Sequence, residues 1–294
     1  MGATLSSAID ATAPPAADDP LRLAVADRLA GGDLRLPLLP RVAGQVVALV
    51  GSSKTDANRL AELIHRDPAL AGHVLRIANS PAYMPRMPIV SLQQAVSRLG
   101  FNVVAEIAFA ASVQGGVFKV PGYESVLLDL WRHALTSGAF AKEVARVRRL
   151  NVESAFLCGL LHAVGKPALL QLVTDIAKAR SLPLPSGPLF ALLEDLHAVV
   201  GVRIGEQWQL PKPVIAAIEH YARYDQAGGF RQDAMITFLA DRLATHALQP
   251  STFGSDDGFR DTRVIADLNL YPDDVAGLLS KKDRVLELVS AMVA

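Results

Sequence analysis

The chain has 294 residues, of which 51% are hydrophobic and 20% are charged, and its formal net charge is zero. This length and composition allow one large domain or two packed subdomains with a substantial core. The balanced charge provides no electrostatic footprint for nucleic acid or for an anionic membrane, so neither is expected as a partner.

Nothing in the sequence suggests export or membrane insertion. We find no apolar run approaching the roughly 20 residues of a membrane-spanning helix, and no signal peptide is expected at the N-terminus. The single cysteine, Cys158, excludes an intrachain disulfide and is expected to be a buried core residue. A reducing, cytoplasmic location is therefore expected.

The first third of the chain predicts a tail followed by a helical subdomain. Residues 1–33, rich in Ala, Pro and Asp, are expected to be a flexible tail with a short helix around residues 21–30. Residues 34–120 then show helical apolar periodicity. Within them, Asp67 is expected to cap a helix that starts at Pro68, and Ser91 with Gln94 forms a capping box.

Residues 121–294 predict a second helical subdomain. One helix is expected from Val126 to about Arg149, and Asn151 is expected to cap the next helix, with Gly165 in its C-terminal turn. A loop is expected over residues 181–188. Further helices are expected at residues 189–207, 212–223, 232–247, from 272 and at 282–293. Because no segment alternates with a period of two, the predicted fold is all-α, with two packed helical subdomains.

Several sequence blocks in a fixed order make this chain resemble the HDOD domain, the HD-related output domain of bacterial signalling proteins. The resemblance covers about residues 34–290. It is carried by the blocks at residues 36–40, 64–70, 74–83, 95–100, 130–133, 155–166, 197–201 and 208–211, and by Ile218-Glu219-His220. It implies a multi-helix HD-like bundle, a regulatory role, and usually no catalysis. The family is similar in fold to the HD-GYP cyclic-di-GMP phosphodiesterases and often accompanies nucleotide second-messenger systems.

The resemblance also implies a degenerate metal site. An HD hydrolase holds its metal with a His, a His-Asp pair and a later Asp, and the matching positions here are His133, His162, Ala163 and Asp241. Ala163 replaces a carboxylate, and a methyl group can neither bind a divalent metal nor orient water. No metal is expected; if one binds, its ligands are His133, His162 and Asp241.

Two further histidines match positions that binuclear relatives use. These are His197 and His220, although Tyr221 stands where a second His of a His-His pair is often found in relatives. The alternative for every one of these histidines is a hydrogen-bonded interior side chain. Asp241 would then simply pair with a histidine in a polar network.

One irregular segment, Asn79–Pro88, is a candidate partner loop. Its candidate residues are Asn79, Tyr83, Met84 and Met87, since aromatic and Met side chains are enriched in interfaces. The alternative is that this loop packs against the second subdomain.

These observations favour a noncatalytic signal-transduction module that acts through protein–protein interaction, with no cofactor. Its partners would be unknown signalling proteins, with a link to a cyclic-dinucleotide pathway. Two alternatives stay open: a metal-dependent phosphohydrolase or phosphodiesterase with a reduced HD ligand set, and a nucleotide-sensing module whose old active site binds without cleaving. Bound metal with turnover would identify the former, and ligand-dependent stabilisation without turnover the latter.

Overall fold

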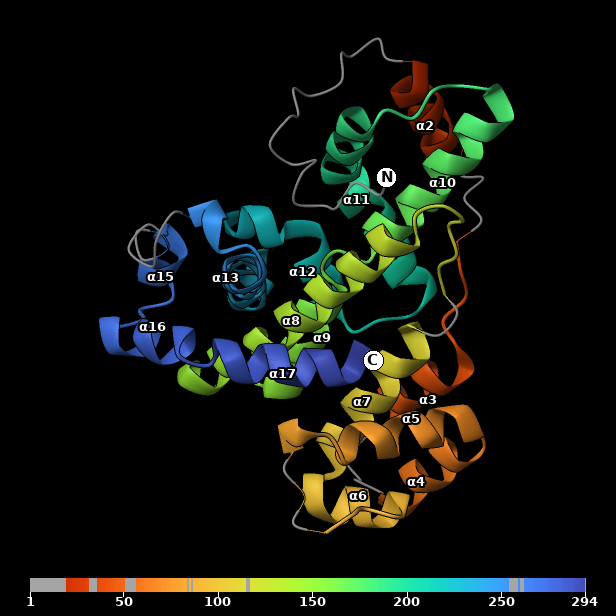
Figure 1. Ribbon diagram of the computed structural model, residues 1–294. Helices are drawn as coiled ribbons and strands as arrows, with labels where there is room; N and C mark the ends of the chain where they lie inside the picture. The colour runs from red at the N-terminus through yellow and green to blue at the C-terminus, as the bar shows by residue number, and fades with distance from the viewer. Residues whose placement is uncertain are drawn as a thin grey trace. The chain divides into compact units, whose positions relative to one another are not determined.

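The computed structural model describes residues 20–31, 36–50, 57–83, 85, 87–114, 117–253, 259 and 262–293, and none of them lies in a β-strand. The all-α prediction is confirmed (Figure 1). The chain forms two compact units. The large unit comprises α2 (Pro20–Ala30) and Phe118–Leu279, and the small unit comprises Leu38–Val117 and Ser280–Ala294.

The small unit is built around the apolar helix α7 (Phe101–Gln114), which packs mainly against three neighbours and also contacts α4 (Ala57–His65). The three neighbours are α3 (Arg41–Val50), α5 (Pro68–Ala78) and α6 (Leu92–Leu99), and α4 packs beside them. Two predicted caps are confirmed, because Asp67 accepts hydrogen bonds from the amides of Ala69 and Leu70, and Ser91 accepts one from Gln94.

The last helix, α17 (Lys282–Val293), belongs to the small unit, whereas the expected C-terminal subdomain, residues 121–294, included it. It packs on the short 3-10 helix η1 (Pro81–Tyr83) and buries Val285, Val289 and Met292. The C-terminal helix thus returns to the small unit through long-range packing. Helical periodicity shows which face of a helix is apolar, but not which helix that face packs against.

The large unit contains a long helix, α8 (Glu124–Arg148), packed against α9 (Val152–Leu161) and α13 (Arg231–Leu248). Beside them, α10 (Gly165–Arg180) packs on α11 (Ser186–Gln207), and α12 (Lys212–His220) contacts α9, α11 and α13. The remaining elements of this unit are η2 (Tyr221–Gln226), η3 (Gly228–Phe230), η4 (Pro250–Phe253), α15 (Arg263–Asp267) and α16 (Pro272–Leu279). The expected loop at 181–188 is shorter than predicted, because α11 already begins at Ser186 and tolerates Pro188 in its first turn.

The short helix expected around residues 21–30 is confirmed as α2, but it is docked on the large unit and is not part of a flexible tail. It buries Leu21, Ala24, Val25 and Leu29, packs on α10, and joins Arg22 to Asp195 through an ion pair of 2.7 Å. The remainder of that tail, residues 1–19 and 32–33, lies outside the described residues.

Glycines allow the helices of the large unit to approach closely. A Cβ atom on Gly165 would lie 1.9 Å from the carbonyl oxygen of His197, and one on Gly159 would lie 2.7 Å from that of Ser137. We expected Gly165 in the C-terminal turn of α9. Instead it is the first residue of α10. A glycine is required at this position because a residue with a side chain would not fit against α11.

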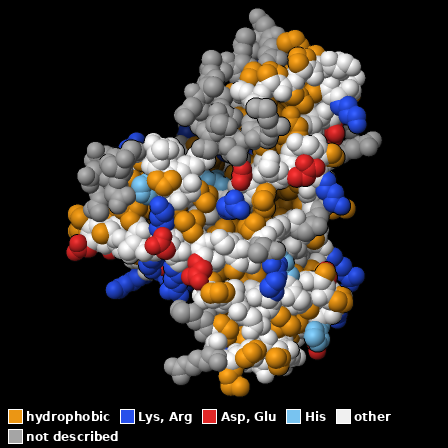
Figure 2. Space-filling model, in the orientation of Figure 1, with side chains coloured by type: hydrophobic (Ala, Val, Ile, Leu, Met, Phe, Trp, Pro, Cys, Tyr) orange, Lys and Arg blue, Asp and Glu red, His pale blue; other side chains and the backbone are white. Residues whose placement is uncertain are grey.

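By length and composition alone, the stretch Val152–Arg180 would suffice to cross a membrane, whereas no membrane-spanning run is expected from the sequence. It consists of α9, a turn at residues 162–164, and α10. Its most apolar window is 67% buried inside the structure, as in the core helices of a globular fold. On the face shown in Figure 2, acidic and basic side chains are interspersed.

Candidate metal centre

Three separate elements of the large unit bring two histidines and one aspartate together. His133 comes from α8, His162 from the turn that follows α9, and Asp241 from α13. Both Nε2 atoms approach the same oxygen, Oδ1 of Asp241, at 2.8 Å from His133 and 3.1 Å from His162. The three ligand atoms lie within 4.8 Å of one another, which makes this a candidate metal centre.

The local fold fixes the orientation of His162. This side chain is 1% exposed, and its Nδ1 lies 2.7 Å from the carbonyl oxygen of Gly159. Because a carbonyl only accepts, Nδ1 carries a hydrogen and donates, and a neutral ring then turns the lone pair of Nε2 toward Asp241. Two electron-rich atoms at 3.1 Å need a cation between them, which is either a proton on Nε2 or a metal ion.

Asp241 is ionised in this setting. Burial raises the pKa of its carboxyl, but hydrogen bonds from His133 and His162 and the electrostatic interaction with these two rings outweigh burial, so the pKa lies well below its usual value. The side chain retains 24% exposure, so the centre keeps some access to solvent.

The donor set suits one divalent ion. Two imidazole nitrogens and a carboxylate are ligands that Zn, Mn or Fe accepts, and the Gly159 carbonyl is the kind of second partner that orients a metal-bound histidine. His133, His162 and Asp241 would hold such an ion. When bound, it would polarise a phosphoryl oxygen or activate a water.

Within the part of the chain that the structure describes, no second set of ligands joins this centre. Ala163 lies in the turn next to His162 and contributes only a methyl group. His220 is paired with its neighbour Glu219 at 3.5 Å. His197 is buried, with its Nε2 3.5 Å from the hydroxyl of Tyr221 and its Nδ1 without a hydrogen-bond partner.

Tyr221 fills the space between the histidines. Its ring lies edge-on to His162, with centroids 4.8 Å apart at 76°, and 6.0 Å from the ring of His197. Burial raises the pKa of its hydroxyl well above the usual value, so this group stays neutral. Burial and the charge of Lys166 together lower the pKa of His197 to about 3. A neutral Tyr–His pair therefore borders the candidate centre.

The residues of the candidate partner loop have different roles. The Asn79 side chain donates to the carbonyls of Leu75 and Ile89 and accepts from the Ile89 amide, each at 2.8 Å, so it fastens the two ends of the loop together. The Met87 side chain is 72% exposed. The Tyr83 side chain is instead partly buried, and this burial raises the pKa of its hydroxyl. Met84 lies outside the described residues.

Sequence reasoning missed the Gly159 carbonyl. The one feature of the sequence that could have indicated it is the spacing of three residues between Gly159 and His162. At a helix end, the carbonyl three positions before a histidine can accept a hydrogen bond from the ring. In the sequence, Tyr221 stands out only as a missing histidine, whereas in the structure its ring forms one wall of the centre.

The helical fold and the His–His–Asp centre define an HD-like protein. The chain belongs to the HDOD family, since the sequence profile of the HDOD domain matches residues 36–224. A curated relative from Treponema pallidum, described as an uncharacterized protein, is 25% identical over 211 residues, or 68% of this chain. The chain matches 39% of that relative's length.

Solved structures share the fold at lower identity. A Geobacter sulfurreducens HDOD domain protein of unknown function is 20% identical with a TM-score of 0.65, covering 92% of this chain and 97% of its own. A Shewanella amazonensis protein provisionally named a phosphohydrolase is 21% identical with a TM-score of 0.65, covering 92% and 98%. A Marinobacter aquaeolei protein provisionally named a signal transduction protein is 24% identical with a TM-score of 0.71, covering 93% and 66%.

Proposed function

We propose that this protein is a noncatalytic signal-transduction module that acts through protein–protein interaction, in a pathway linked to a nucleotide second messenger. The observation that carries the proposal is Ala163. It occupies the position where an HD hydrolase has a carboxylate, directly after a histidine that is otherwise well oriented. The fold thus keeps the site's framework without one of its working groups.

Other features support a regulatory role. The neutral Tyr221–His197 pair supplies no charged group for proton transfer near neutral pH. The exposed Met87, at the end of a loop that Asn79 fastens, provides an apolar contact for a protein partner. An unpaired, buried Cys158 fits a reducing compartment, and we place the protein in the cytoplasm.

Affinity capture with the full chain tests the interaction part. The bait is wild type, His133→Gln, His162→Gln and Met87→Ser, with each variant first checked for folding by circular dichroism. We expect one partner to be retained by wild type and both histidine variants, and to be weakened by Met87→Ser. If the His162→Gln variant folds but no longer captures the partner, the histidines have more than a structural role, which would contradict the proposal.

A second candidate is a metal-dependent phosphohydrolase with a reduced ligand set. It is favoured by the convergence of three ligand atoms within 4.8 Å and by the anchoring of His162 Nδ1 on the Gly159 carbonyl. This candidate predicts a stoichiometric metal and a turnover that His162→Ala abolishes.

A further inference from the structure

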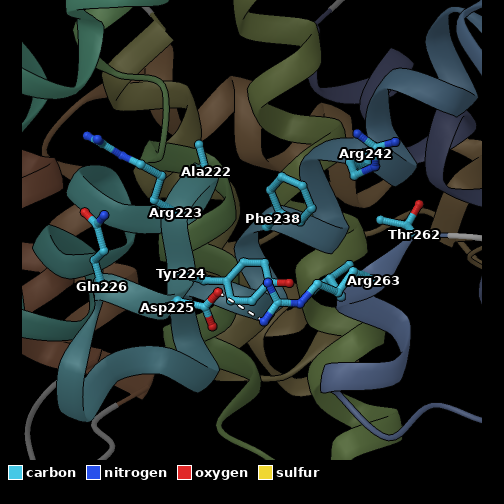
Figure 3. A pocket seen from close by; sticks show the side chains of 10 residues that line it. Ala222, Arg223, Tyr224, Asp225, Gln226, Phe238, Arg242, Thr262 and Arg263 are labelled. Atoms are coloured by element: carbon cyan, nitrogen blue, oxygen red, sulfur yellow. Dashed lines mark ion pairs between the residues drawn. The ribbon is translucent and has the colours of Figure 1, made fainter.

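A hollow of the large unit is lined in part by α13, the helix that carries Asp241. It has a volume of about 540 Å³ and is lined by residues of η2, α13 and α15 (Figure 3). Arg242, which lines it, directly follows Asp241 on α13, and successive helical residues point about 100° apart. The hollow and the His–His–Asp centre therefore use different faces of the same helix.

The carboxylates at one side of this hollow are already matched by guanidinium groups. Asp225 accepts from Arg231 at 2.8 Å and lies 3.2 Å from Arg263. Arg263 also lies 3.2 Å from Asp267, which accepts a hydrogen bond of 2.8 Å from the Tyr224 hydroxyl. These two acids and two arginines form a network without excess charge.

Two other arginines of the lining have no such partner. Among the described residues, no carboxylate lies within ion-pair distance of Arg242 or Arg223, and the Nε of Arg242 is buried without a hydrogen bond. Burial lowers the pKa of Arg242, and Asp241 only partly opposes this. Arg223 is exposed at the rim, and its side chain in Figure 3 extends away from Arg242.

Aromatic rings hold the Arg242 guanidinium in place. Its central carbon lies 4.5 Å from the ring centroid of Phe253 and 5.6 Å from that of Phe238. A guanidinium stacked in this way keeps its plane fixed and leaves edge N–H groups for an oxyanion, which it can bind with two parallel hydrogen bonds. Because the guanidinium is already held in one orientation, it loses little orientational freedom when a ligand binds.

The same hollow offers a surface for a planar ring. Phe238 and Tyr224 pack at 5.6 Å and 57°, and both line the hollow between Arg242 and Asp225 (Figure 3). Pockets for small molecules usually combine such aromatic walls with a few polar groups, at volumes of roughly 300–1,000 Å³.

We propose that this hollow binds a small phosphorylated molecule with a planar ring, of the mononucleotide class. The guanidinium of Arg242 takes the phosphoryl oxygens, Arg223 adds charge at the rim, and Phe238 with Tyr224 packs against the ring. The site is independent of the proposed function, because none of its residues belongs to the His–His–Asp centre.

Calorimetric titration of the full chain tests this site. The probes are adenosine and guanosine 5′-monophosphate, with the two nucleosides and inorganic phosphate as controls. We expect at least one nucleotide to bind with a Kd below about 1 mM, and the nucleosides and phosphate to bind at least about tenfold more weakly. Arg242→Gln should weaken binding by about tenfold or more, because it removes charge-assisted hydrogen bonds.

Matched variants separate this site from its surroundings. Arg223→Gln changes an exposed side chain, should fold normally, and should weaken binding less than Arg242→Gln. Arg180→Gln, at the exposed end of α10, should leave binding unchanged. His162→Gln should also leave it unchanged, which separates this site from the candidate metal centre.

Three results would overturn the assignment. The first is that neither nucleotide binds. The second is nucleotide binding that is unchanged in both Arg223→Gln and a folded Arg242→Gln, or nucleotide binding that is lost in His162→Gln instead. The third is inorganic phosphate binding as tightly as the nucleotides. Should Arg242→Gln fail to fold, as judged by circular dichroism, Arg223→Gln alone decides.

Discussion

Replacing Gly165 by Ala tests how tightly the helices next to the candidate centre are packed. The new Cβ atom would lie 1.9 Å from the His197 carbonyl oxygen and 2.7 Å from the Gly201 amide nitrogen. Both atoms belong to the backbone of α11, so no side chain can rotate away. Since real Cβ contacts are essentially never below 3.0 Å, α10 and α11 must separate by about 1 Å in a close-packed interior.

This separation should cost about 3 kcal/mol or more of the free energy of unfolding, at the upper end of the usual range for overpacking. For a unit of this size, the thermal midpoint should fall by roughly 6–12 °C. Urea unfolding followed by circular dichroism measures the first quantity, and differential scanning calorimetry the second. Gly277→Ala in α16 is the matched control, because a Cβ there meets nothing within 4 Å. It should instead stabilise the unit by about 0.5–1 kcal/mol.

A Gly165→Ala protein as stable as wild type would refute the close approach of α10 to α11. So would equal destabilisation by Gly165→Ala and Gly277→Ala, since the reasoning rests on the difference in space at the two positions.

Three further changes test individual contacts. Because the pKa of His197 is lowered from 6.5 to about 3, the unfolded chain takes up this proton first, and stability should fall between about pH 6.5 and about pH 3. The loss is at most about 1.4 kcal/mol per pH unit, and His197→Gln should flatten this part of the urea-unfolding profile; an unchanged slope would contradict the shift. Asn79→Ala removes three hydrogen bonds and should cost about 2–4 kcal/mol in urea unfolding, whereas Ala at the exposed Gln93 should cost little. Tyr221→Phe should change stability by less than about 1 kcal/mol, because its hydroxyl contact is long, whereas Tyr221→Ala should cost about 3–5 kcal/mol in the same assay.

Much of the local structure follows directly from the sequence. Helix starts at Pro68, Leu92 and Val152 are encoded by Asp67, Ser91 and Asn151, whose side chains accept backbone amides as expected. These signals are short-range, so one sequence suffices to read them. The all-α class follows equally, because helical periodicity runs through nearly every segment.

Long-range packing was harder to predict. Nothing in α17 marks it as part of the small unit, and nothing in residues 20–30 distinguishes a docked helix from a tail with helical propensity. Gly165 appeared to be a helix end, since glycine is common there. Its actual role depends on α11, which lies more than twenty residues further along the chain.

The candidate metal centre could be named from the family pattern, yet its geometry could not. His133, His162 and Asp241 come from three elements separated by as many as 108 residues. The arginine-lined hollow had no sequence signal at all. Its residues come from η2, α13 and α15, and the local pair Arg223-Tyr224 gives no sign that Phe238, Arg242 and Arg263 lie beside it.

We propose that Ala163 leaves this fold without hydrolytic activity. This absence of activity is tested most directly by elemental analysis of protein purified without chelator, with the same sample assayed on cyclic dinucleotides and on a generic phosphodiester after addition of Mn, Fe or Zn. We predict turnover no greater than that of His162→Ala, whatever metal is bound. Stoichiometric metal together with turnover that His162→Ala abolishes would contradict the account and make the protein an enzyme with a three-ligand centre.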